Sequence, residues 1–406
     1  MAATCAATIG GALAGLLPYL TFMIPGGAWR WGDTESFSGL VHHFLRADYG
    51  TFATGQEDRG IAWWVQPRLY VEGIGRQLLG LPALLGLAGF GVAIAKAEDG
   101  RRRGFALALL ASWLVAGPLF VSRFDLPAEG YYRVVVERFH SFPTTIYCVA
   151  VGFGAAWFVK LKFWSRPALP MVVLVANLVL AGLLAGPQAS MRGSTVLDDF
   201  LRNTLGALEP NAVLFTRGDS FNFGCVYAQE VLDLRRDVAC IYGPMVGHDW
   251  YRERLLERHP DLTLLLDGSP MQLPELITAN AETRPVYLSS RIPLLDPEVA
   301  GVIPPTWPAA GTLLRAASPG ERPPLPKAVE AALLEDWEGF VLNSRLADAA
   351  ELDESLESTA WDHYAQVWIV LASGFEVMDD PAGAARCRDR ARELSPWLLQ
   401  APAARP

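Results

Sequence analysis

Long stretches without a charged side chain divide the first half of the chain. They cover residues 3–24, 78–95, 104–121, 144–159 and 168–186. A helix of about 20 apolar residues is long enough to cross a hydrocarbon core of about 30 Å. The pattern therefore predicts an α-helical membrane bundle of about five spans over residues 1–186. Because no basic residue precedes Arg30, we expect a chain that starts inside a membrane domain rather than a signal peptide.

Basic residues are unevenly distributed among the connections between these stretches. The connections around Lys96 and Lys160 are net basic, whereas the arginines of residues 25–77 and 123–142 are balanced by Asp or Glu. Lys and Arg accumulate on the cytoplasmic side of a membrane. We therefore expect both of these loops, and the chain after residue 187, to lie outside the cytoplasm. The sequence predicts a multi-pass integral membrane protein with a periplasmic or luminal C-terminal domain.

Beyond residue 187, short apolar runs alternate with helical patterns. A helix is predicted over residues 196–208, and the runs "AVLFT" and "VACIY" flank a second helix over residues 224–234. Strand, helix and strand at this spacing indicate a βαβ unit and a parallel sheet. Further strands are predicted at "LTLLL" and "PVYLS", and an extended loop over residues 293–326. We therefore expect an extracytoplasmic α/β domain over residues 187–324.

The remaining residues, 325–406, are predicted to be helical. The segment "WDHYAQVWIVLASGFEVMDDPAGAARCRDRARELSP" has the order of a tetratricopeptide helix pair, with a turn at residues 379–381 and a closing Pro396. Any helical hairpin fits the same pattern. Since one such pair cannot bury its apolar face alone, we expect it to cap the α/β domain.

Composition excludes one class of partner. The chain has a net charge of −9 and no basic face dense enough to neutralise several phosphates, which argues against nucleic acid. The five cysteines are scattered without metal-ligand spacing, so the sequence predicts neither a metal site nor another cofactor. Cys225 and Cys240 both fall in the predicted external domain and could form a disulfide there. We expect instead two free, packed thiols.

The first external loop contains a predicted helix. Apolar side chains recur at helical spacing after the candidate N-cap residues Asp33, Thr34 and Ser36; these are Phe37, Leu40, Val41, Phe44 and Leu45. The pattern predicts a short helix along the membrane interface. His42 and His43 lie within it, but adjacent helical residues point about 100° apart and cannot easily bind one ion. They are predicted to line the mouth of an active site or to anchor the helix at the interface.

Arginines on both external loops could hold a lipid phosphate. Arg46, Arg133 and Arg138 are predicted to converge on one phosphate through bidentate hydrogen bonds. Glu137 and His140 stand beside two of them and could orient the guanidinium groups. The alternative is that these side chains only extend to the lipid headgroups.

Two motifs of the predicted α/β domain could bind a ligand. "RGDS" at residues 217–220 is typical of a βα turn in which Asp219 or Ser220 caps the next helix. "GPMVGHDWY" at residues 243–251 ends a predicted strand, where α/β sheets tend to bind ligands. His248 and Asp249 could therefore line a small site, or form a paired loop that binds nothing.

Three blocks of the chain together resemble a known family of membrane enzymes. They are "WRWGDTESFSGLVHHFLRADYGTF", "YYRVVVERFHSF" and "NAVLFTRGDSFNFGCVYAQEVLDLRRDVACIYGPMVGHDWY", in this order within residues 25–255. The chain is similar to multi-span protein O-mannosyltransferases that act on plexin-type receptor domains in animals and have bacterial relatives. The resemblance implies a GT-C-type enzyme that takes a sugar from a polyprenyl or dolichyl phosphate and passes it to a Ser or Thr hydroxyl outside the cytoplasm.

The resemblance also implies roles for side chains. In such a reaction a carboxylate accepts the hydroxyl proton, and cations hold the departing lipid phosphate. We carry over phosphate-side roles to Arg46, Arg133 and Arg138, and acceptor-side roles to His42, His43, Asp219, His248 and Asp249. The family's proposed base lies in a Gly-Asp-Ser-Gly-Glu-like motif that this sequence does not contain. Asp33, Glu35 and His140 are the candidate catalytic residues by position rather than by resemblance.

The resemblance covers the C-terminal half of the family. We therefore expect a truncated product, one half of a split enzyme that needs an N-terminal partner half, or a relative without catalysis. The expected partners are a polyprenyl-phosphate sugar, a protein acceptor and membrane lipid. A non-catalytic membrane-anchored binding or scaffold protein is the alternative, and the effect of Arg138→Ala on sugar transfer would separate the two. A transporter is disfavoured because the predicted spans carry no charges.

Overall fold

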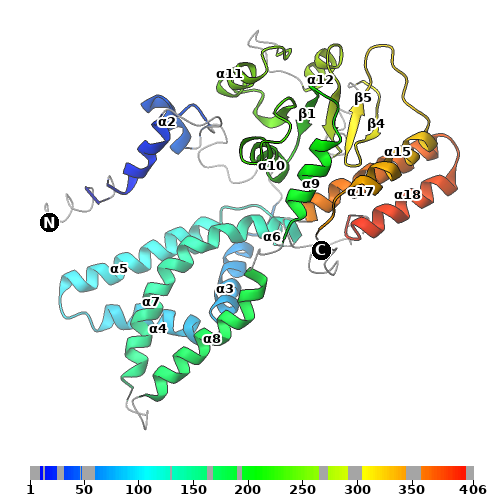
Figure 1. Cartoon of the computed structure of the whole chain (residues 1–406). Coiled ribbons are helices and arrows are strands. Elements are labelled where there is room, and N and C mark those ends of the chain that lie inside the picture. The colour runs from blue at the N-terminus through cyan, green and yellow to red at the C-terminus, as the bar shows by residue number, and fades with distance from the viewer. Residues whose placement is uncertain are drawn as a thin grey trace. The chain divides into compact units, whose positions relative to one another are not determined.

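The computed structural model of the chain describes residues 10–11, 14–24, 32–45, 47, 60–128, 130–161, 168–189, 194–264, 273–290, 304–343 and 358–398. Two compact units emerge (Figure 1). The helical unit comprises Phe52–Ser194 and Asp353–Ser355, and the sheet unit comprises Met1–Thr51, Thr195–Leu352 and Leu356–Pro406. The N-terminal segment thus belongs to the unit that contains the sheet. The three domains predicted from the sequence, 1–186, 187–324 and 325–406, stay predictions.

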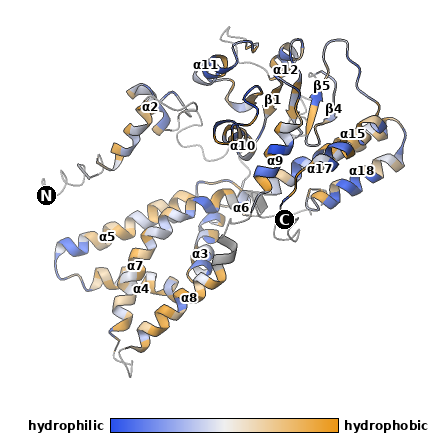
Figure 2. Cartoon of the chain, viewed as in Figure 1, coloured by the Kyte–Doolittle hydropathy of each residue, from blue (hydrophilic) through white to orange (hydrophobic). Residues whose placement is uncertain are grey.

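The helical unit contains a helix at each predicted span that the structure describes beyond residue 60. Its helices are α3 (Val65–Gln77), α4 (Leu81–Ala95), α5 (Gly100–Leu114), α6 (Gly130–Glu137), α7 (Ser141–Val159) and α8 (Leu169–Ala189). A π-helical segment, Val115–Leu119, extends α5, and Arg138–His140 forms a 3-10 turn before α7. Figure 2 shows apolar residues along α4, α5, α7 and α8. Helix α5 begins where Asp99 accepts a hydrogen bond from the amide of Arg102 at 2.7 Å.

Fewer of the described helices are long and apolar enough to span a membrane than the sequence predicts. Within the described ranges, Val135–Val159 is long and apolar enough to cross a bilayer, and the pair α3 and α4, bent by 114°, would add a second span if it counts as one. Ala14–Met23 and Leu169–Leu184 are shorter apolar helices. The five-span bundle therefore stays a prediction, and one apolar helix is only weak support for membrane insertion.

Glycine permits an unusually close approach of α4 and α7. A methyl carbon at Gly89 would lie 2.9 Å from the amide nitrogen of Gly154, and closer still to the carbonyl oxygen of Ala150. A methyl carbon at Gly154 would in turn overlap the carbonyl of Leu85. Small residues that let helix backbones touch are typical of helix pairs in membranes. Beside this crossing, the unit's core is built from large aromatic residues, among them Tyr70, Phe90, Trp113 and Tyr147.

The sheet unit is built around a five-stranded sheet with the order β2-β1-β3-β5-β4. β1 (Val213–Thr216) pairs in parallel with β2 (Ala239–Tyr242) and with β3 (Val286–Ser289). β5 (Leu313–Ala316) runs antiparallel to β3 and to the edge strand β4 (Thr306–Ala309). The predicted strands "AVLFT", "VACIY" and "PVYLS" and the βαβ unit are confirmed.

Helices cover both faces of this sheet (Figure 1). One face packs against α9 (Val196–Gly206), α10 (Asp219–Glu230), α15 (Pro326–Gly339) and α17 (Ser358–Val377), and α18 (Pro381–Leu394) packs on α17. The other face packs against α11 (Asp249–Arg258) and α12 (Leu273–Ala281). Phe375 of α17 lies so close to Gly383 of α18 that an added methyl would overlap its ring. The predicted helical pair is present; its likeness to a tetratricopeptide unit stays a prediction.

The N-terminal segment of this unit contains the predicted interfacial helix. Helix α2 covers Phe37–Phe44, and the Ser36 hydroxyl caps it by accepting a hydrogen bond from the amide of Gly39 at 2.9 Å. Of the three candidate N-caps, Ser36 therefore holds this position. The aromatic rings of Tyr19 and Phe44 meet edge to face at 5.2 Å, which packs α2 against the preceding 3-10 helix Leu17–Met23.

Three local predictions were wrong. Residues 293–326 are not one extended loop, because β4 and β5 form a hairpin there; Pro308 suits an edge strand, and positive φ angles of 52° and 63° at Ala310 and Gly311 make the turn. Helix α10 begins at Asp219 instead of residue 224. Its N-cap residue is Gly218, so neither Asp219 nor Ser220 caps it as predicted. The described residues 262–264 of "LTLLL" are not in a strand, and its last two residues lie outside the described ranges.

Cys225 and Cys240 are free, buried thiols, as expected from the sequence. Cys225 lies on α10 and Cys240 on β2, in the core beneath one face of the sheet. Hydrogen bonding to Cys240, together with burial, raises the pKa of the Cys225 thiol well above its usual range. Both sulfurs are therefore packed as small apolar groups.

Candidate functional site

The two segments predicted to lie outside the cytoplasm meet within the helical unit. The amide of Ile61 donates to Asp125 at 2.8 Å, and the Gln66 side chain donates to the carbonyl of Leu126 at 2.5 Å. These hydrogen bonds join residues 60–77, the described end of the predicted loop 25–77, to the predicted loop 123–142.

Glu137, at the end of α6, joins two guanidinium groups. Arg133, one helical turn earlier, donates to its Oε1 at 2.9 Å, and Arg76 of α3 donates to the same oxygen at 3.2 Å. The Arg133 side chain is 19% exposed, so its charge is partly shielded from water. Two cations and one carboxylate leave a net charge of +1 in the cluster. A carboxylate that fixes two guanidiniums prepares them to bind an anion in a set orientation.

Arg138 contacts the ring of its neighbour Phe139. Its guanidinium lies 4.9 Å from the ring centroid, which is the geometry of a cation–π contact. Arg133 and Arg138 therefore lie on one short segment but have different neighbours. Arg46 lies outside the described residues. The convergence of these three arginines on one phosphate stays a prediction.

His140, next to this cluster, is almost completely buried. The residue is 2% exposed, and neither ring nitrogen has a hydrogen-bond partner among the described residues. Its ring meets the edge of Tyr70 at 5.1 Å, and the Tyr70 hydroxyl accepts a hydrogen bond from the Trp113 indole at 2.9 Å. The Oε1 of Gln66, also buried, has no partner within the described ranges either.

Unpaired polar atoms of this kind mark a place where a ligand or water can bind. A buried donor or acceptor without a partner costs about 1–3 kcal/mol, and such groups are few in folded proteins. The π-helical segment Val115–Leu119 lies beside them: a methyl at Gly117 would be 3.0 Å from the Tyr70 ring. π-Helical turns within α-helices are frequent at functional sites. The sequence suggested His140 and Glu137, but gave no sign of Tyr70, Gln66 or Arg76.

In the sheet unit, the predicted ligand-binding residues flank the ends of β1 and β2. Asp219 accepts a hydrogen bond from the Tyr242 hydroxyl at 3.0 Å. His248 is the N-cap residue of α11, and its ring stacks on Trp250 at 6.3 Å. Asp249, the first residue of α11, forms an ion pair with Arg252, so both predictions for His248 and Asp249 stay predictions. The structure gives each of these three predicted residues a different neighbour.

Asp33, Glu35, His42 and His43 lie in the N-terminal segment of the sheet unit. The ring of His43 is 5.9 Å from that of Phe22, and its Nδ1 would lie 2.9 Å from a methyl at Gly32. Arg254 of α11 donates to the carbonyl of Gly32 at 3.2 Å, which ties this segment to the sheet unit. The predicted roles of these residues, and of His140, stay predictions.

A polar cluster that the sequence reasoning missed lies at the carboxyl ends of β1 and β3. The Ser290 hydroxyl donates to Oε1 of Gln366 at 3.1 Å and lies 3.4 Å from Nδ1 of His363. Ser289 Oγ and Asn222 Nδ2 are buried without a partner among the residues described. Open parallel sheets bind ligands at this edge. The serine pair directly after the run "PVYL" was the available signal.

Within the described ranges, no three His, Cys, Asp or Glu side chains come close enough together to hold an ion. The Glu137 cluster itself offers two guanidinium groups and a carboxylate, with the His140 imidazole next to them.

Comparison with known proteins supports a relation to protein O-mannosyltransferases. Residues 197–261 match the family model described as TMEM260-associated domain 2. The chain is 26% identical to the protein O-mannosyl-transferase TMEM260 of Mus musculus over 262 residues, 61% of this chain and 36% of the relative. It is 24% identical to the protein O-mannosyl-transferase tmem260 of Dictyostelium discoideum over 323 residues, 68% of this chain and 38% of the relative.

These matches cover only part of each relative, so they do not assign the whole relative's activity to this chain. The aligned part is little more than a third of the length of either relative. The matched family model covers the region from α9 to α11, which includes Asp219, His248 and Asp249. No solved structure matches the chain. The names of the relatives state a sugar and a protein acceptor, but neither the sugar donor nor the plexin-type acceptor that the resemblance implied.

Proposed function

We propose that this chain is a membrane glycosyltransferase, or a subunit of one, which transfers mannose from a polyprenyl phosphate to a Ser or Thr hydroxyl of an extracytoplasmic protein. The observation that carries the proposal is the similarity to two proteins named protein O-mannosyl-transferases, over 61% and 68% of the chain. The Glu137 cluster supplies chemistry that this reaction needs.

The arginines of the cluster suit the leaving phosphate. As the bond between the sugar's anomeric carbon and the phosphate oxygen breaks, negative charge grows on that oxygen. Arg133 and Arg76, held by Glu137 at 2.9 and 3.2 Å, would stabilise this charge most strongly in the transition state. Because the guanidiniums are already fixed, little reorganisation is needed at the moment of reaction.

The acceptor side needs a base. The hydroxyl oxygen forms the new bond to the anomeric carbon, and its proton passes to a carboxylate, for which Asp33 and Glu35 are the candidates. His140, with both ring nitrogens unpaired in the described part, would bind a sugar hydroxyl or a water at the phosphate side. The sheet unit, with the ends of β1 and β2 and the helical pair α17 and α18, would bind the protein acceptor.

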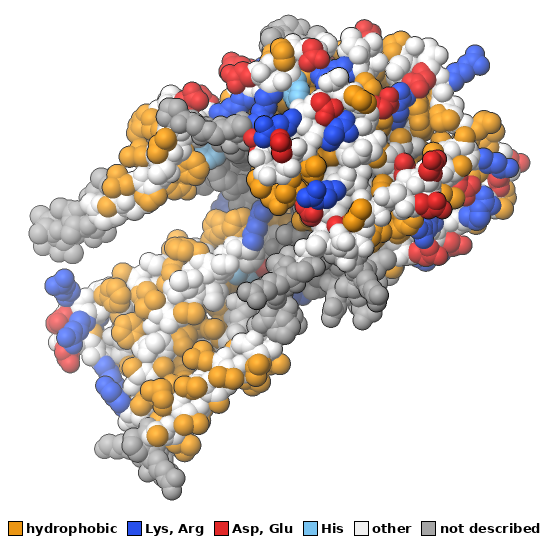
Figure 3. Space-filling model, in the orientation of Figure 1, with side chains coloured by type: hydrophobic (Ala, Val, Ile, Leu, Met, Phe, Trp, Pro, Cys, Tyr) orange, Lys and Arg blue, Asp and Glu red, His pale blue; other side chains and the backbone are white. Residues whose placement is uncertain are grey.

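The surface of the helical unit is consistent with a bilayer around it. Large apolar side chains on α8 and α4 are exposed, such as Leu178 at 67%, Leu183 at 68% and Leu84 at 66%. Figure 3 shows the visible face of this unit as mainly apolar, with charged side chains gathered at the end formed by the α4–α5 connection. Lipid chains would cover such a surface. We therefore extend the proposal to a multi-pass chain with the sheet unit outside the cytoplasm.

A transfer assay tests the proposal. The full chain is reconstituted in lipid nanodiscs with polyprenyl-phosphate mannose and a secreted acceptor domain, and mass spectrometry detects hexose on Ser or Thr. Arg133→Gln is expected to lower the rate about 10²–10³-fold, as loss of one transition-state donor does. Arg68→Gln is the matched control, because Arg68 lies on the exposed face of α3 and pairs with Glu72. Equal rates for the two variants would contradict the assigned role.

A second arm addresses the expected N-terminal partner half. The same reaction is run with a co-expressed membrane segment that corresponds to the part of the relatives outside the aligned region. Transfer in either arm supports the proposal. If neither arm transfers sugar while the chain remains folded and binds the acceptor domain, the alternative holds, and the chain is a non-catalytic, membrane-anchored binding or scaffold protein.

A further inference from the structure

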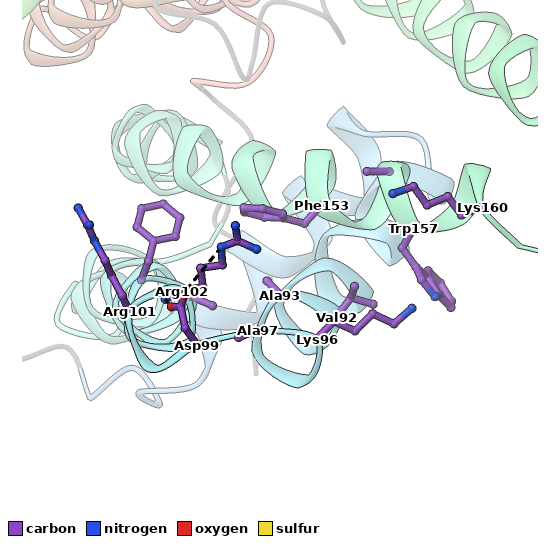
Figure 4. Close-up of a pocket in the computed structure, with 13 residues that line it drawn as sticks. Val92, Ala93, Lys96, Ala97, Asp99, Arg101, Arg102, Phe153, Trp157 and Lys160 are labelled. Carbon is purple, nitrogen blue, oxygen red and sulfur yellow. Dashed lines mark hydrogen bonds and ion pairs between the residues drawn. The ribbon is translucent and has the colours of Figure 1, made fainter.

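A cavity of about 920 Å³ lies between the end of α4, the start of α5 and the end of α7 (Figure 4). It belongs entirely to the helical unit. His140 is the N-cap of α7 and Lys160, which lines the cavity, is its C-cap. At a rise of 1.5 Å per residue, the helix from His140 to Lys160 separates the two by about 30 Å. This is close to the thickness of a hydrocarbon core, about 30 Å, so the cavity is distinct from the Glu137 cluster.

Positive charge predominates in the cavity. Lys96, Arg101, Arg102 and Lys160 line it, and Asp99 is the one carboxylate in the lining. Lys96, Arg101 and Lys160 form no ion pair with any residue that the structure describes. Figure 4 shows that Lys96, Arg102 and Lys160 come from three different helices.

The single carboxylate does not cancel this charge. Asp99 is engaged as the cap of α5, where it accepts the amide hydrogen bond of Arg102 at 2.7 Å. Arg102 pairs with Glu98 and lies 3.9 Å from Asp99. With Glu98 and Asp99 both counted against the four cations, a net charge of +2 remains at the cavity.

The walls of the cavity are apolar and aromatic. Phe105, Phe153 and Trp157 line it, and Phe105 is 56% exposed. A small inorganic anion would leave these rings in water. Cationic groups beside exposed aromatic rings match an amphiphile that has an anionic headgroup and an acyl chain.

We propose that this cavity binds an anionic phospholipid. The headgroup phosphate lies between Lys96 and Lys160, and the first part of an acyl chain lies against Phe153 and Trp157. Basic pockets between membrane helices bind acidic headgroups in this way. The site is at the end of the bundle that the distribution of Lys and Arg predicts to be cytoplasmic, and it is independent of the proposed sugar transfer.

Native mass spectrometry of the full chain tests this site. The protein is released from nanodiscs of phosphatidylcholine and phosphatidylglycerol, and retained lipid is counted. We expect selective retention of phosphatidylglycerol, and about a fivefold weaker affinity for each cation removed, or about 25-fold for the double variant Lys96→Gln, Lys160→Gln. Arg103→Gln is the matched control: Arg103 carries the same charge and follows Arg102 but does not line the cavity.

Specific outcomes would overturn the proposal. One is equal retention of phosphatidylglycerol by the double variant and the Arg103→Gln control, with unchanged circular dichroism in both. Another is equal retention of phosphatidylcholine by the unaltered chain, since the headgroup would then not matter. Displacement of the lipid by inorganic phosphate would identify a free phosphate as the ligand instead.

Discussion

Replacing Gly89 with alanine is expected to force α4 and α7 apart. The new methyl carbon would lie 2.9 Å from the amide nitrogen of Gly154, against 3.4 Å or more in ordinary contacts, and would overlap the carbonyl oxygen of Ala150. Both atoms belong to the helix backbone and cannot rotate away as a side chain could. The backbone of α7 must therefore move as a whole.

The size of the effect follows from two opposing terms. Overpacking costs about 1–3 kcal/mol, and the rigid backbone places Gly89→Ala near the upper value. Alanine recovers about 0.5–1 kcal/mol through its higher helix propensity. We expect a net loss of about 2 kcal/mol in the free energy of unfolding. Gly91→Ala, two residues along the same helix, should gain about 0.5–1 kcal/mol, because no described atom lies within 4 Å of a methyl there.

Thermal unfolding in one detergent, followed by the helical circular-dichroism signal, compares the two variants. They make the same chemical change in the same helix, so propensity cancels in the comparison. A difference of about 3 kcal/mol corresponds to about 6–12 °C between their midpoints. If Gly89→Ala unfolds at or above the temperature of Gly91→Ala, the two helices do not touch at Gly89 and the packing described for this pair is refuted.

Two further predictions concern pH and are measured by urea unfolding. Side-chain hydrogen bonds from Arg235 lower the pKa of Asp237 to about 2. Asp237→Asn should therefore lower the free energy of unfolding by about 1 kcal/mol at pH 7, a value discounted for partial exposure of the side chain. This difference between the unaltered chain and the variant should vanish as the pH falls from about 4 to 2. A difference that stays constant over that range would contradict the assigned pKa shift. Burial and the charge of Arg284 lower the pKa of His259. The free energy of unfolding should therefore decrease as the pH is lowered from about 6.5, because the unfolded chain binds a proton that the folded one does not. The decrease should be less steep in His259→Gln, and identical slopes for the two proteins would contradict this prediction.

The parallel part of the sheet could be predicted because its strands are continuous apolar runs bounded by turns. β1, β2 and β3 are buried on both faces, so nearly every position in "AVLFT" and "VACIY" is apolar. The hairpin of β4 and β5 could not be found in this way. Pro308 within β4 argues against a strand unless the strand is known to be at an edge.

The candidate site shows the same limit. Arg133 and Glu137 are four residues apart on a helix, so their ion pair follows from sequence spacing alone. Arg76 and Glu137 are 61 positions apart in the sequence, so their contact cannot be predicted from local spacing. The burial of His140 depends on Tyr70 of another helix in the same way. Local spacing therefore predicted half of the cluster, and only tertiary packing supplied the rest.

Pro308 has a consequence for how copies of this protein meet. β4 forms the outer edge of the sheet beyond β5, and a proline there has no amide hydrogen to offer a neighbouring chain. Open edges with unpaired amides promote intermolecular strand pairing and aggregation. Wherever two copies meet edge to edge, Pro308 therefore removes one backbone donor from this side of the sheet.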